Sequence, residues 1–239
     1  MSPIYVPGKV VLKKESVAAD PYYNNVSLLL HGDGTNGSTT IVDSSPSPKT
    51  VTAVGDAQIS TAQSKFGGAS IAFDGTGDYL TIPGTSFDLP GDFTIEAFFL
   101  LNNARSEDET IVGKWDDPLL RSWLLNVRAS SVIFALGQSG AIDAFQPSAT
   151  IASNTWYHIA VSRAGSSIKI FLNGSQIGTT YTSSYNCTSS AQDLAIGINL
   201  DADRTPLDGY IDDLRITKGV ARYTSNFTPP TAPFPEVLG

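Results

Sequence analysis

The stretch TWYHIAVSRAGSSIKIFLNGSQIGTT, residues 155–180, predicts three β-strands joined by two turns. Apolar side chains such as Ile159 and Val161 alternate in it with small or polar ones, which is the period of a strand with one buried face. The pair Asn173 and Gly174 is typical of a type I′ turn, because both central residues of that turn need a positive φ. A meander with one apolar face needs a second layer to cover it, so the stretch indicates a β-sandwich.

The rest of the chain shows the same pattern of short apolar runs separated by turn residues. Short runs rich in Val, Ile, Leu, Phe, Tyr and Thr are bounded by Gly, Pro, Asn, Asp or Ser, and a helical period is almost absent. The runs expected to form strands are 26–31, 70–74, 79–82, 93–101, 122–127, 131–136, 156–163, 167–172, 193–198 and a run within 209–223. We therefore expect an all-β, two-sheet antiparallel sandwich. It comprises an extended N-terminal arm (1–22), a jelly-roll domain (23–228) and a Pro-rich C-terminal tail (229–239).

Composition narrows the classes of partner. The 239 residues are 41% hydrophobic and 16% charged, with a formal net charge of −8. Such acidity argues against nucleic acid, because binding phosphates requires clustered Lys and Arg. No apolar run approaches the ~20 residues of a membrane span, so no membrane insertion is expected. The N-terminus lacks the apolar region of a secretory signal, so we expect synthesis in a cytoplasm, with Cys187 as an unpaired thiol.

Several motifs, in their order along the chain, carry a family resemblance. They are SKFGGASIAFDGTGDYLTIP, TWYHIAVSR…SIKIFLNGSQIG and LDGYIDDLRITKGVARYTSNFTPPTAPFP. Together they resemble the laminin G-like, concanavalin A-like lectin/glucanase jelly-roll family over about residues 23–235. The last motif is similar to the version found in tailed-bacteriophage virion proteins. This fold serves lectins, glycosidases, adhesion modules and virion decoration, so the resemblance is more specific for fold than for function.

The resemblance implies a non-catalytic virion surface protein made in the host cytoplasm. It would decorate the capsid or tail as a homo-oligomer or in several copies, with cell-surface glycans as further candidate partners. Residues 1–22 are too apolar for a flexible linker, so they are expected to be either a disordered leader or an arm that attaches the protein to other virion proteins. The alternative is a receptor-binding tail fibre or adhesin that binds carbohydrate. A glycan hydrolase is less favoured, because the five glutamates do not form the Glu-x-Asp-x-x-Glu strand of the family's glucanases. No catalytic residue is therefore assigned.

Two places could hold Ca²⁺, the one cofactor that the sequence suggests, because Ca²⁺ takes oxygen ligands from Asp side chains and loop carbonyls. The loop NLDADRTPLDG brings Asp201, Asp203 and Asp208 together in a turn-rich segment. Laminin G-like proteins often bind Ca²⁺ near a loop rim, although a solvated acidic loop is the alternative. The second place would share an ion between Asp33 and Asp212.

The adjacent carboxylates Asp212 and Asp213 are expected to have separate roles. Neighbouring residues of a strand point to opposite faces, so the two cannot act together on one atom. Asp212 is predicted on the buried face, with Tyr210 and Leu214, and a buried carboxylate needs a partner. The partner would be a Ca²⁺ or the backbone amides of the loop that follows residue 31. Asp213 is predicted to face outward beside Arg215.

Aromatic and acidic side chains in two loops are the candidates for glycan contact. An exposed Trp or Tyr near Asp or Asn can stack on a sugar ring and bind its hydroxyl groups. The alternative for the two tryptophans is a place in the core. The candidate residues are Trp115, Asp116, Asp117, Trp123 and Tyr185.

Overall fold

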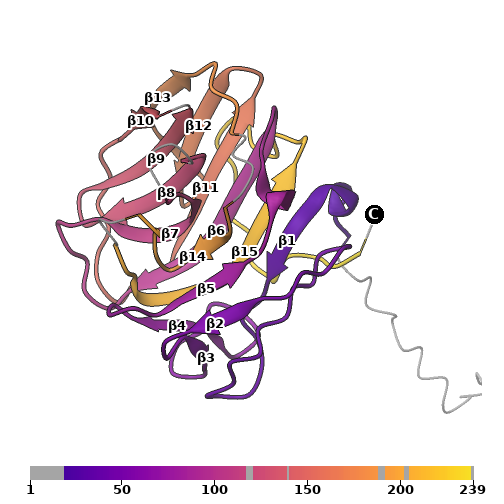
Figure 1. The fold of residues 1–239 in the computed structure, drawn as a ribbon, viewed down its shortest axis with the longest axis vertical. Helices are drawn as coiled ribbons and strands as arrows, with labels where there is room; N and C mark the ends of the chain where they lie inside the picture. The colour runs from indigo at the N-terminus through magenta and orange to yellow at the C-terminus, as the bar shows by residue number, and fades with distance from the viewer. Residues whose placement is uncertain (1–18, 117–120, 139, 188–191, 202–204, 238–239) are drawn as a thin grey trace, which may run out of the picture.

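The protein folds as two antiparallel β-sheets packed face to face, as a computed structural model shows for residues 19–116, 121–138, 140–187, 192–201 and 205–237 (Figure 1). The larger, eight-stranded sheet has the order β13-β12-β11-β6-β15-β4-β3, with β1 also paired to β15. The seven-stranded sheet has the order β10-β9-β8-β7-β14-β5-β2. The all-β sandwich predicted from the sequence is confirmed.

The strands of the larger sheet are β1 (Val26–Leu30), β3 (Gln58–Ser60), β4 (Ser70–Asp74), β6 (Phe93–Leu101), β11 (Tyr157–Ala164), β12 (Ser167–Leu172), β13 (Ser175–Thr182) and β15 (Asp208–Lys218). Those of the smaller sheet are β2 (Thr52–Val54), β5 (Tyr79–Ile82), β7 (Glu109–Lys114), β8 (Trp123–Arg128), β9 (Ser131–Gln138), β10 (Ala141–Phe145) and β14 (Leu194–Ile196). Two short 3₁₀ turns, η1 (Tyr23–Asn25) and η2 (Thr85–Phe87), complete the described elements. No described helix is long and apolar enough to cross a membrane.

The meander predicted for residues 155–180 corresponds to strands β11, β12 and β13. Strand β11 pairs with β12 from Ile159 opposite Leu172 to Ala164 opposite Ser167. The β12–β13 turn has Asn173 at φ 49° and Gly174 at φ 77°, as the predicted turn requires. A Cβ on Gly174 would overlap the carbonyl oxygen of Phe227, so glycine also lets the C-terminal segment pass close to this turn.

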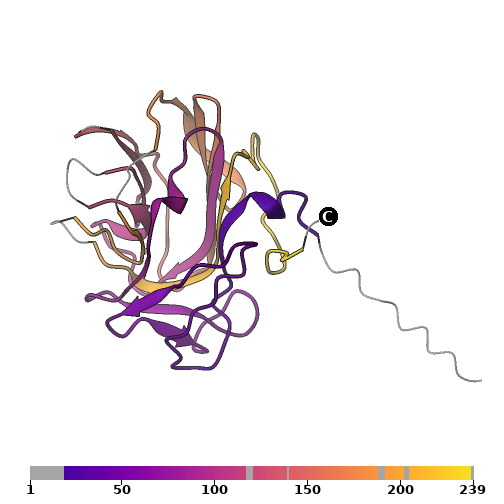
Figure 2. The ribbon, with the colours of Figure 1, turned by 45° about the vertical axis from the view of Figure 1, so that its right-hand side comes forward.

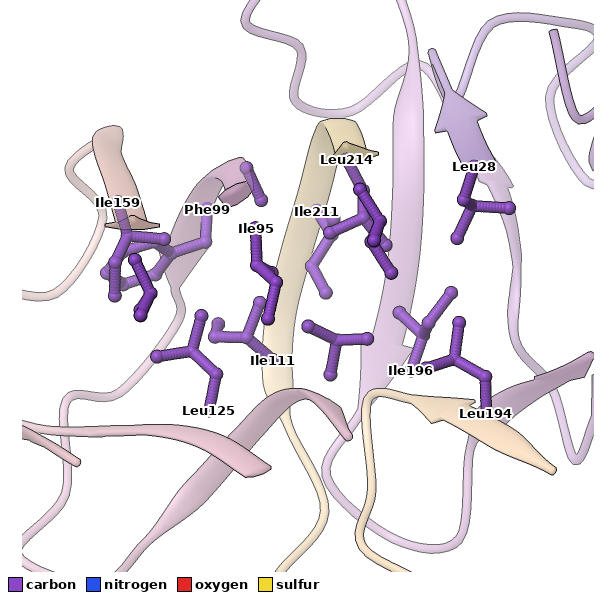
Figure 3. Packing of buried hydrophobic residues seen from close by; sticks show 14 of the residues in the cluster. Leu28, Ile95, Phe99, Ile111, Leu125, Ile159, Leu194, Ile196, Ile211 and Leu214 are labelled. Carbon is purple, nitrogen blue, oxygen red and sulfur yellow. The ribbon is translucent and has the colours of Figure 1, made fainter. Parts of the chain in front are cut away.

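The core lies between the two sheets and draws on nearly every strand (Figure 3). Ile95, Phe99 and Ile211 of the larger sheet face Ile111 and Leu125 of the smaller one, and all five are fully buried. Burying a side chain of this size stabilises a fold by about 1.5–3 kcal/mol. This continuous layer fixes the position of the loops at either end of the sandwich.

Strand β15 changes its partner halfway along. Its first residues pair with β4, up to Ile211 opposite Ile71, and its later ones pair with β1, from Leu214 opposite Leu30. The register with β6 shifts between Asp212 and Arg215, and Asp213 has a φ of 47°. This is a β-bulge, in which an extra residue interrupts the alternation of faces.

The bulge corrects the sequence-based assignment of faces. Ile211 and Leu214 point into the core, whereas Asp212 and Arg215 lie on the outer face of the larger sheet. Asp212 is 1% exposed and Asp213 is fully buried. The prediction that Asp212 is buried is confirmed, and the prediction that Asp213 faces outward is wrong, because the bulge residue turns inward beneath the C-terminal segment.

The chain's two terminal segments cover that outer face. The backbone N–H of Asp20 donates to the carbonyl of Val237 at 2.8 Å, and Phe234 is 3% exposed beside Phe98 and Leu29. The packed unit thus extends beyond the predicted limits 23–228 on both sides. Figures 1 and 2 show the described C-terminal segment passing beside β1, on the side of the sandwich away from β8, β9 and β10.

Candidate functional site

Four charged side chains form a buried network on the outer face of the larger sheet, here called the outer-face ion network: Asp20, Glu96, Arg215 and Arg222. The Arg215 guanidinium donates to Glu96 Oε1 from Nε at 3.0 Å and from Nη2 at 2.8 Å. Its Nη1 donates to Asp20 Oδ2 at 3.0 Å, and Arg222 donates to both oxygens of Asp20 at 2.9 and 2.7 Å. The network therefore ties β6 and β15 to the segments at both ends of the domain.

The network sets the charge of Glu96. Burial alone would raise the pKa of this carboxyl, but the charge of Arg215 and the hydrogen bond from His158 outweigh it and bring the pKa to about 2. Tyr223 donates its hydroxyl to Glu96 Oε2 at 2.8 Å, and burial followed by the charge of Glu96 raises the pKa of this tyrosine. His158 is 1% exposed, and its Nε2 lies 3.3 Å from Glu96 Oε2.

A second group of ionisable side chains, here called the carboxylate cluster, gathers around the β15 bulge. Its members are His31, Asp33, Asp212, Asp213 and Glu236. His31 Nδ1 contacts Asp213 Oδ1, and its Nε2 lies 3.0 Å from Glu236 Oε1. The other oxygen of Asp213 accepts the backbone N–H of Phe234 at 2.9 Å. Strand β1, the bulge and the C-terminal segment therefore meet at one imidazole.

Asp212 has a different partner from either one predicted. Its Oδ2 accepts the backbone N–H groups of Lys65 and Phe66 at 2.7 and 3.0 Å, so the amides come from the loop before β4. Its Oδ1 is buried without a hydrogen-bond partner. Asp33 lies against the same loop, because a Cβ on Gly67 would overlap its carboxylate.

The cluster has more negative charge than its partners neutralise. Burial, aided by the nearby charges of Asp213 and Asp33, raises the pKa of Asp212 to about 7, although the two backbone N–H groups act against this. Partial desolvation, aided by the charge of Asp213, also raises the pKa of Asp33, although His31 acts against this. For His31, burial lowers the pKa, but contact with Asp213 and the charge of Glu236 outweigh it and raise the pKa overall.

The fit of this cluster to Ca²⁺ is poor. Among the described residues, no group of three or more His, Cys, Asp or Glu side chains is placed to hold a metal ion. Both oxygens of Asp213 are engaged, and the two residues predicted to share the ion offer only the free Oδ1 of Asp212 and the exposed carboxylate of Asp33. Calcium at Asp33 and Asp212 stays a prediction.

The predicted loop site does not converge in the described residues. Asp201 is held by Arg121, whose Nε donates at 2.9 Å. Asp208 lies at the start of β15, where it accepts hydrogen bonds from Asn102 and Asn103 at 2.8 and 3.1 Å. Asp203 lies outside the described residues. Each described carboxylate thus has its own protein partners, so the structure gives no support for a shared ion.

The two tryptophans proposed for glycan contact are not free platforms. Trp123 is fully buried in the core, and its Nε1 donates to the carbonyl of Phe87 at 2.9 Å. Trp115 is 6% exposed and packs on Leu124 and Ala135. The guanidinium of Arg121 lies over its ring, 5.4 Å from the centroid, while also bonded to Asp201.

The remaining rim candidates are more accessible. Asp116 and Tyr185 are half-buried, and Asp117 lies outside the described residues. Sequence reasoning missed Arg121, which joins Trp115 to Asp201 and so places the two loops side by side. It also missed His31 and Glu236, since nothing in the linear order brings the C-terminal segment to the end of β1.

Glu96, Glu107 and Glu109 are poorly placed for general acid and base catalysis. Glu96 and Glu109 are fully buried, in different sheets, and are bonded to Arg215 and Arg105 respectively. Glu107 is exposed and accepts a hydrogen bond from its neighbour Ser106. Glycoside hydrolysis needs two carboxyl groups facing each other across a substrate at roughly 5–10 Å. These three residues do not provide that arrangement.

Sequence comparison identifies the family. Residues 74–222 match the family model described as the concanavalin A-like lectin/glucanases superfamily, so this protein belongs to that superfamily. The match covers the sandwich from the end of β4 to Arg222 of the ion network. A search of curated protein sequences finds no match.

Solved structures with the same fold include binding domains of bacterial toxins. The binding domain of Paraclostridial Mosquitocidal Protein 1 aligns with a TM-score of 0.62 at 15% identity, covering 82% of this chain and 49% of that one. A structure of botulinum neurotoxin type C, for which interaction with two ganglioside molecules is described, gives 0.64 at 17% identity, covering 83% and 49%. This chain spans about half the length of those structures.

A third similar structure is matched over nearly its whole length. Domain 4 of AbnA, a GH43 extracellular arabinanase from Geobacillus stearothermophilus, in complex with arabinotriose, aligns with a TM-score of 0.61 at 18% identity. The alignment covers 82% of this chain and 93% of that domain. At these identities the likeness establishes the fold and leaves function to be argued from the residues of this chain.

Proposed function

We propose that this protein is a non-catalytic, lectin-like binding module on the surface of a tailed-bacteriophage virion. It decorates the capsid or tail, is attached through its N-terminal segment, and binds glycan through the loops at the far end of the sandwich. The observation that carries the proposal is that the buried carboxylates among the described residues are engaged by the protein itself. Glu96, Glu109 and Asp213 are bound to cations or amides of the protein itself and hold the fold together.

The placement of the two ends of the sandwich supports this division of roles. The chain enters at Asp20 and leaves at Val237, and these two residues are hydrogen-bonded to each other. In Figures 1 and 2 the strands β8, β9 and β10 lie away from that point. A module attached by its terminal segments would therefore present the loops around β8 and β9 to the surroundings.

Glycan contact is assigned to the half-buried rim residues. Asp116 offers a carboxylate acceptor for sugar hydroxyl groups, and Tyr185 offers an aromatic ring with part of its surface accessible. The similar AbnA domain, matched over nearly its whole length and solved in complex with arabinotriose, supports a sugar as the ligand. In this chain the ligand would be a polysaccharide of the host surface or of its environment.

The attachment is tested by rebinding. Virions stripped of this protein are mixed with the purified chain or with a chain that lacks residues 1–18. The deletion ends before Asp20, because that residue belongs to the outer-face ion network. We expect the intact chain to rebind and the shortened chain to lose rebinding. Equal rebinding by both would reject attachment through the N-terminal segment.

The alternative function is receptor binding by a tail fibre or adhesin. Screening the protein on an array of bacterial polysaccharides distinguishes this role from decoration of the virion. Binding that is lost in Asp116→Ala or Tyr185→Ala, without rebinding to stripped virions, would favour the receptor-binding role. Rebinding to stripped virions without a signal on the glycan array would favour decoration of the virion without glycan binding. Release of reducing ends from any polysaccharide would contradict the non-catalytic proposal. Repeating the array with Ca²⁺ and with a chelator tests the predicted ion as well.

A further inference from the structure

A surface pocket of about 410 Å³ lies where the start of β1 meets the end of β15. Its volume falls within the roughly 300–1,000 Å³ that is usual for small-molecule sites. Neither Asp116 nor Tyr185 lines it, so it is distinct from the rim residues assigned to glycan contact. The polar side chains that line it include Asn24, Asn25, Ser27, Ser47, Lys49 and Lys218.

Two lysines place their ammonium groups at this pocket. Lys49 Nζ donates to the carbonyl of Ser47 at 2.6 Å and to Ser45 Oγ at 3.4 Å. Lys218 Nζ donates to the carbonyl of Ser86 at 2.9 Å. These bonds hold both side chains in place, and each ammonium group keeps at least one further N–H donor, because an ammonium group has three. The pocket therefore offers two positioned cationic donors.

The positive charge of this pair is incompletely neutralised. Lys49 Nζ lies 3.9 Å from Asp43 Oδ2, but that buried carboxylate also accepts the backbone N–H groups of Leu29 and Ser45. No carboxylate among the described residues forms an ion pair with Lys218. Burial lowers the pKa of both ammonium groups, although nearby carboxylates act against this, and the charge of Lys218 lowers the pKa of Lys49 further. An anion bound between the two lysines would stabilise both charges.

The rest of the polar lining is uncharged. Asn24, Asn25 and Ser47 are exposed, and Ser27 is half-buried. Asn25 Nδ2 donates to the carbonyl of Lys218 at 3.1 Å, which holds this amide beside the lysine. Amides and hydroxyl groups are suitable partners for sugar hydroxyl groups, and no described Asp or Glu lines the pocket to repel an anion. The pocket thus combines two cations with several neutral hydrogen-bonding groups.

We propose that this pocket binds an acidic sugar residue, with the sugar carboxylate between Lys49 and Lys218 and its hydroxyl groups at Asn24 and Ser47. Hydrogen bonds between an ammonium group and a carboxylate are stronger than those between neutral groups, so the site selects a uronic acid over a neutral sugar. The pocket is larger than a simple inorganic ion needs, and its amide and hydroxyl lining fits the rest of the sugar. The proposal goes beyond the proposed function and does not depend on the virion role.

The test is isothermal titration calorimetry of the full-length protein at low salt with three probes: trigalacturonate, its neutral methyl ester and inorganic sulfate. We expect trigalacturonate to bind, the methyl ester to bind at least about tenfold more weakly, and 0.5 M NaCl to weaken the binding of trigalacturonate. No binding of trigalacturonate, or equal binding of its methyl ester, would overturn the proposal. Sulfate binding as tight as that of trigalacturonate would indicate an adventitious ion only, and would overturn it too.

Three variants locate the ligand. Lys49→Met and Lys218→Met should each weaken trigalacturonate binding about tenfold, and Asn24→Ala should weaken it about threefold without changing the binding of sulfate. The matched control is Lys169→Met, because Lys169 also donates to a loop carbonyl, that of Thr224, but does not line the pocket. This control should bind like the wild type.

Urea melts of each variant show whether the fold is retained. Wild-type affinity in both folded variants, Lys49→Met and Lys218→Met, would overturn the proposal, as would an equal loss in Lys169→Met. Trigalacturonate binding that is lost in Asp116→Ala but kept in both lysine variants would assign the ligand to the rim loops and would also overturn it. The proposed rim contact could then stand without this site, so the two proposals fail separately.

Discussion

Replacing Arg215 by Met tests the outer-face ion network, which joins both ends of the chain to the larger sheet. The substitution keeps an unbranched apolar stem but removes all three hydrogen bonds from the guanidinium to Glu96 and Asp20. It also removes the cation that lies 3.8 Å from the Phe234 ring. Because Glu96 is fully buried, it would keep a charge with little compensation. Breaking a buried pair in this way costs about 3–5 kcal/mol.

The pH dependence of stability gives an independent measure of the same network. The pKa of Glu96 is about 2 in the folded protein against an ordinary value of 4.5. A lowered carboxyl pKa contributes stability that is fully present above pH 4.5 and is lost as the pH falls toward 2. The difference amounts to about 3 kcal/mol. In Arg215→Met this loss between pH 4.5 and 2 should shrink, because the pKa of Glu96 then rises.

Urea denaturation from pH 2.5 to 7, followed by tryptophan fluorescence, measures both effects. Arg128→Met is the matched control, because this arginine pairs with Asp108 at a partly exposed position and should cost less than about 1 kcal/mol. The double variant Glu96→Gln/Arg215→Met should be more stable than Arg215→Met alone, since it leaves no unpaired glutamate. A cost below 1 kcal/mol for Arg215→Met, with an unchanged pH profile, would refute the reasoning.

Three further predictions concern other parts of the fold. The pKa of Asp212 is raised to about 7, so the contribution of this residue to stability falls as the pH rises from about 4 through 7. In urea melts, the free energy of unfolding of Asp212→Asn should therefore depend less on pH over that range than that of the wild type. Gly174→Ala should lower the free energy of unfolding by about 1–3 kcal/mol in the same melts, because φ is positive there and the Phe227 carbonyl occupies the space of a Cβ. Cys187 is fully buried, and burial raises its pKa to about 12, so a thiol reagent should label it only at the rate of unfolding. The first statement would be contradicted if the stability of Asp212→Asn fell with rising pH as much as that of the wild type. An unchanged free energy of unfolding in Gly174→Ala would contradict the second, and rapid labelling of native Cys187 would contradict the third.

The sandwich itself could be predicted because its determinants are local. Alternation around Ile159 and the pair Asn173-Gly174 specify strands and a turn without reference to the rest of the chain. The placement of Trp123 follows the same rule, since it alternates with Leu125 and Val127 in β8, and all three are buried. The prediction that Trp123 contacts glycan relied on the residue type and did not take this alternation into account.

The β15 bulge could not be located by a rule that assumes strict alternation. Ile211 and Leu214 are both core residues although they are three apart, and that spacing was the available sign of an extra residue. Once Asp213 is counted as the inserted residue, Asp212 and Arg215 fall on the same outer face. The face assignment from the sequence was therefore right for Leu214 and Arg215, after the bulge, and wrong for Ile211 and Asp212, before it.

The candidate sites depend on contacts between distant parts of the chain. Arg121 meets Asp201 across 80 residues, and His31 meets Asp213 and Glu236 through the return of the C-terminal segment. Neither pairing has a local signature in the sequence. The sequence shows which residues carry carboxylates that could bind Ca²⁺, but the tertiary fold decides which partners those carboxylates have.

The central claim is that the terminal side of this sandwich attaches the protein while the opposite loops remain free to bind. The most direct measurement is the affinity for stripped virions of the proposed phage source, compared between the intact chain and the chain lacking residues 1–18. We predict saturable binding of the intact chain and a loss of at least about tenfold on deletion, equivalent to about 1.4 kcal/mol. Equal affinity of the two chains, or no saturable binding by the intact one, would contradict the account.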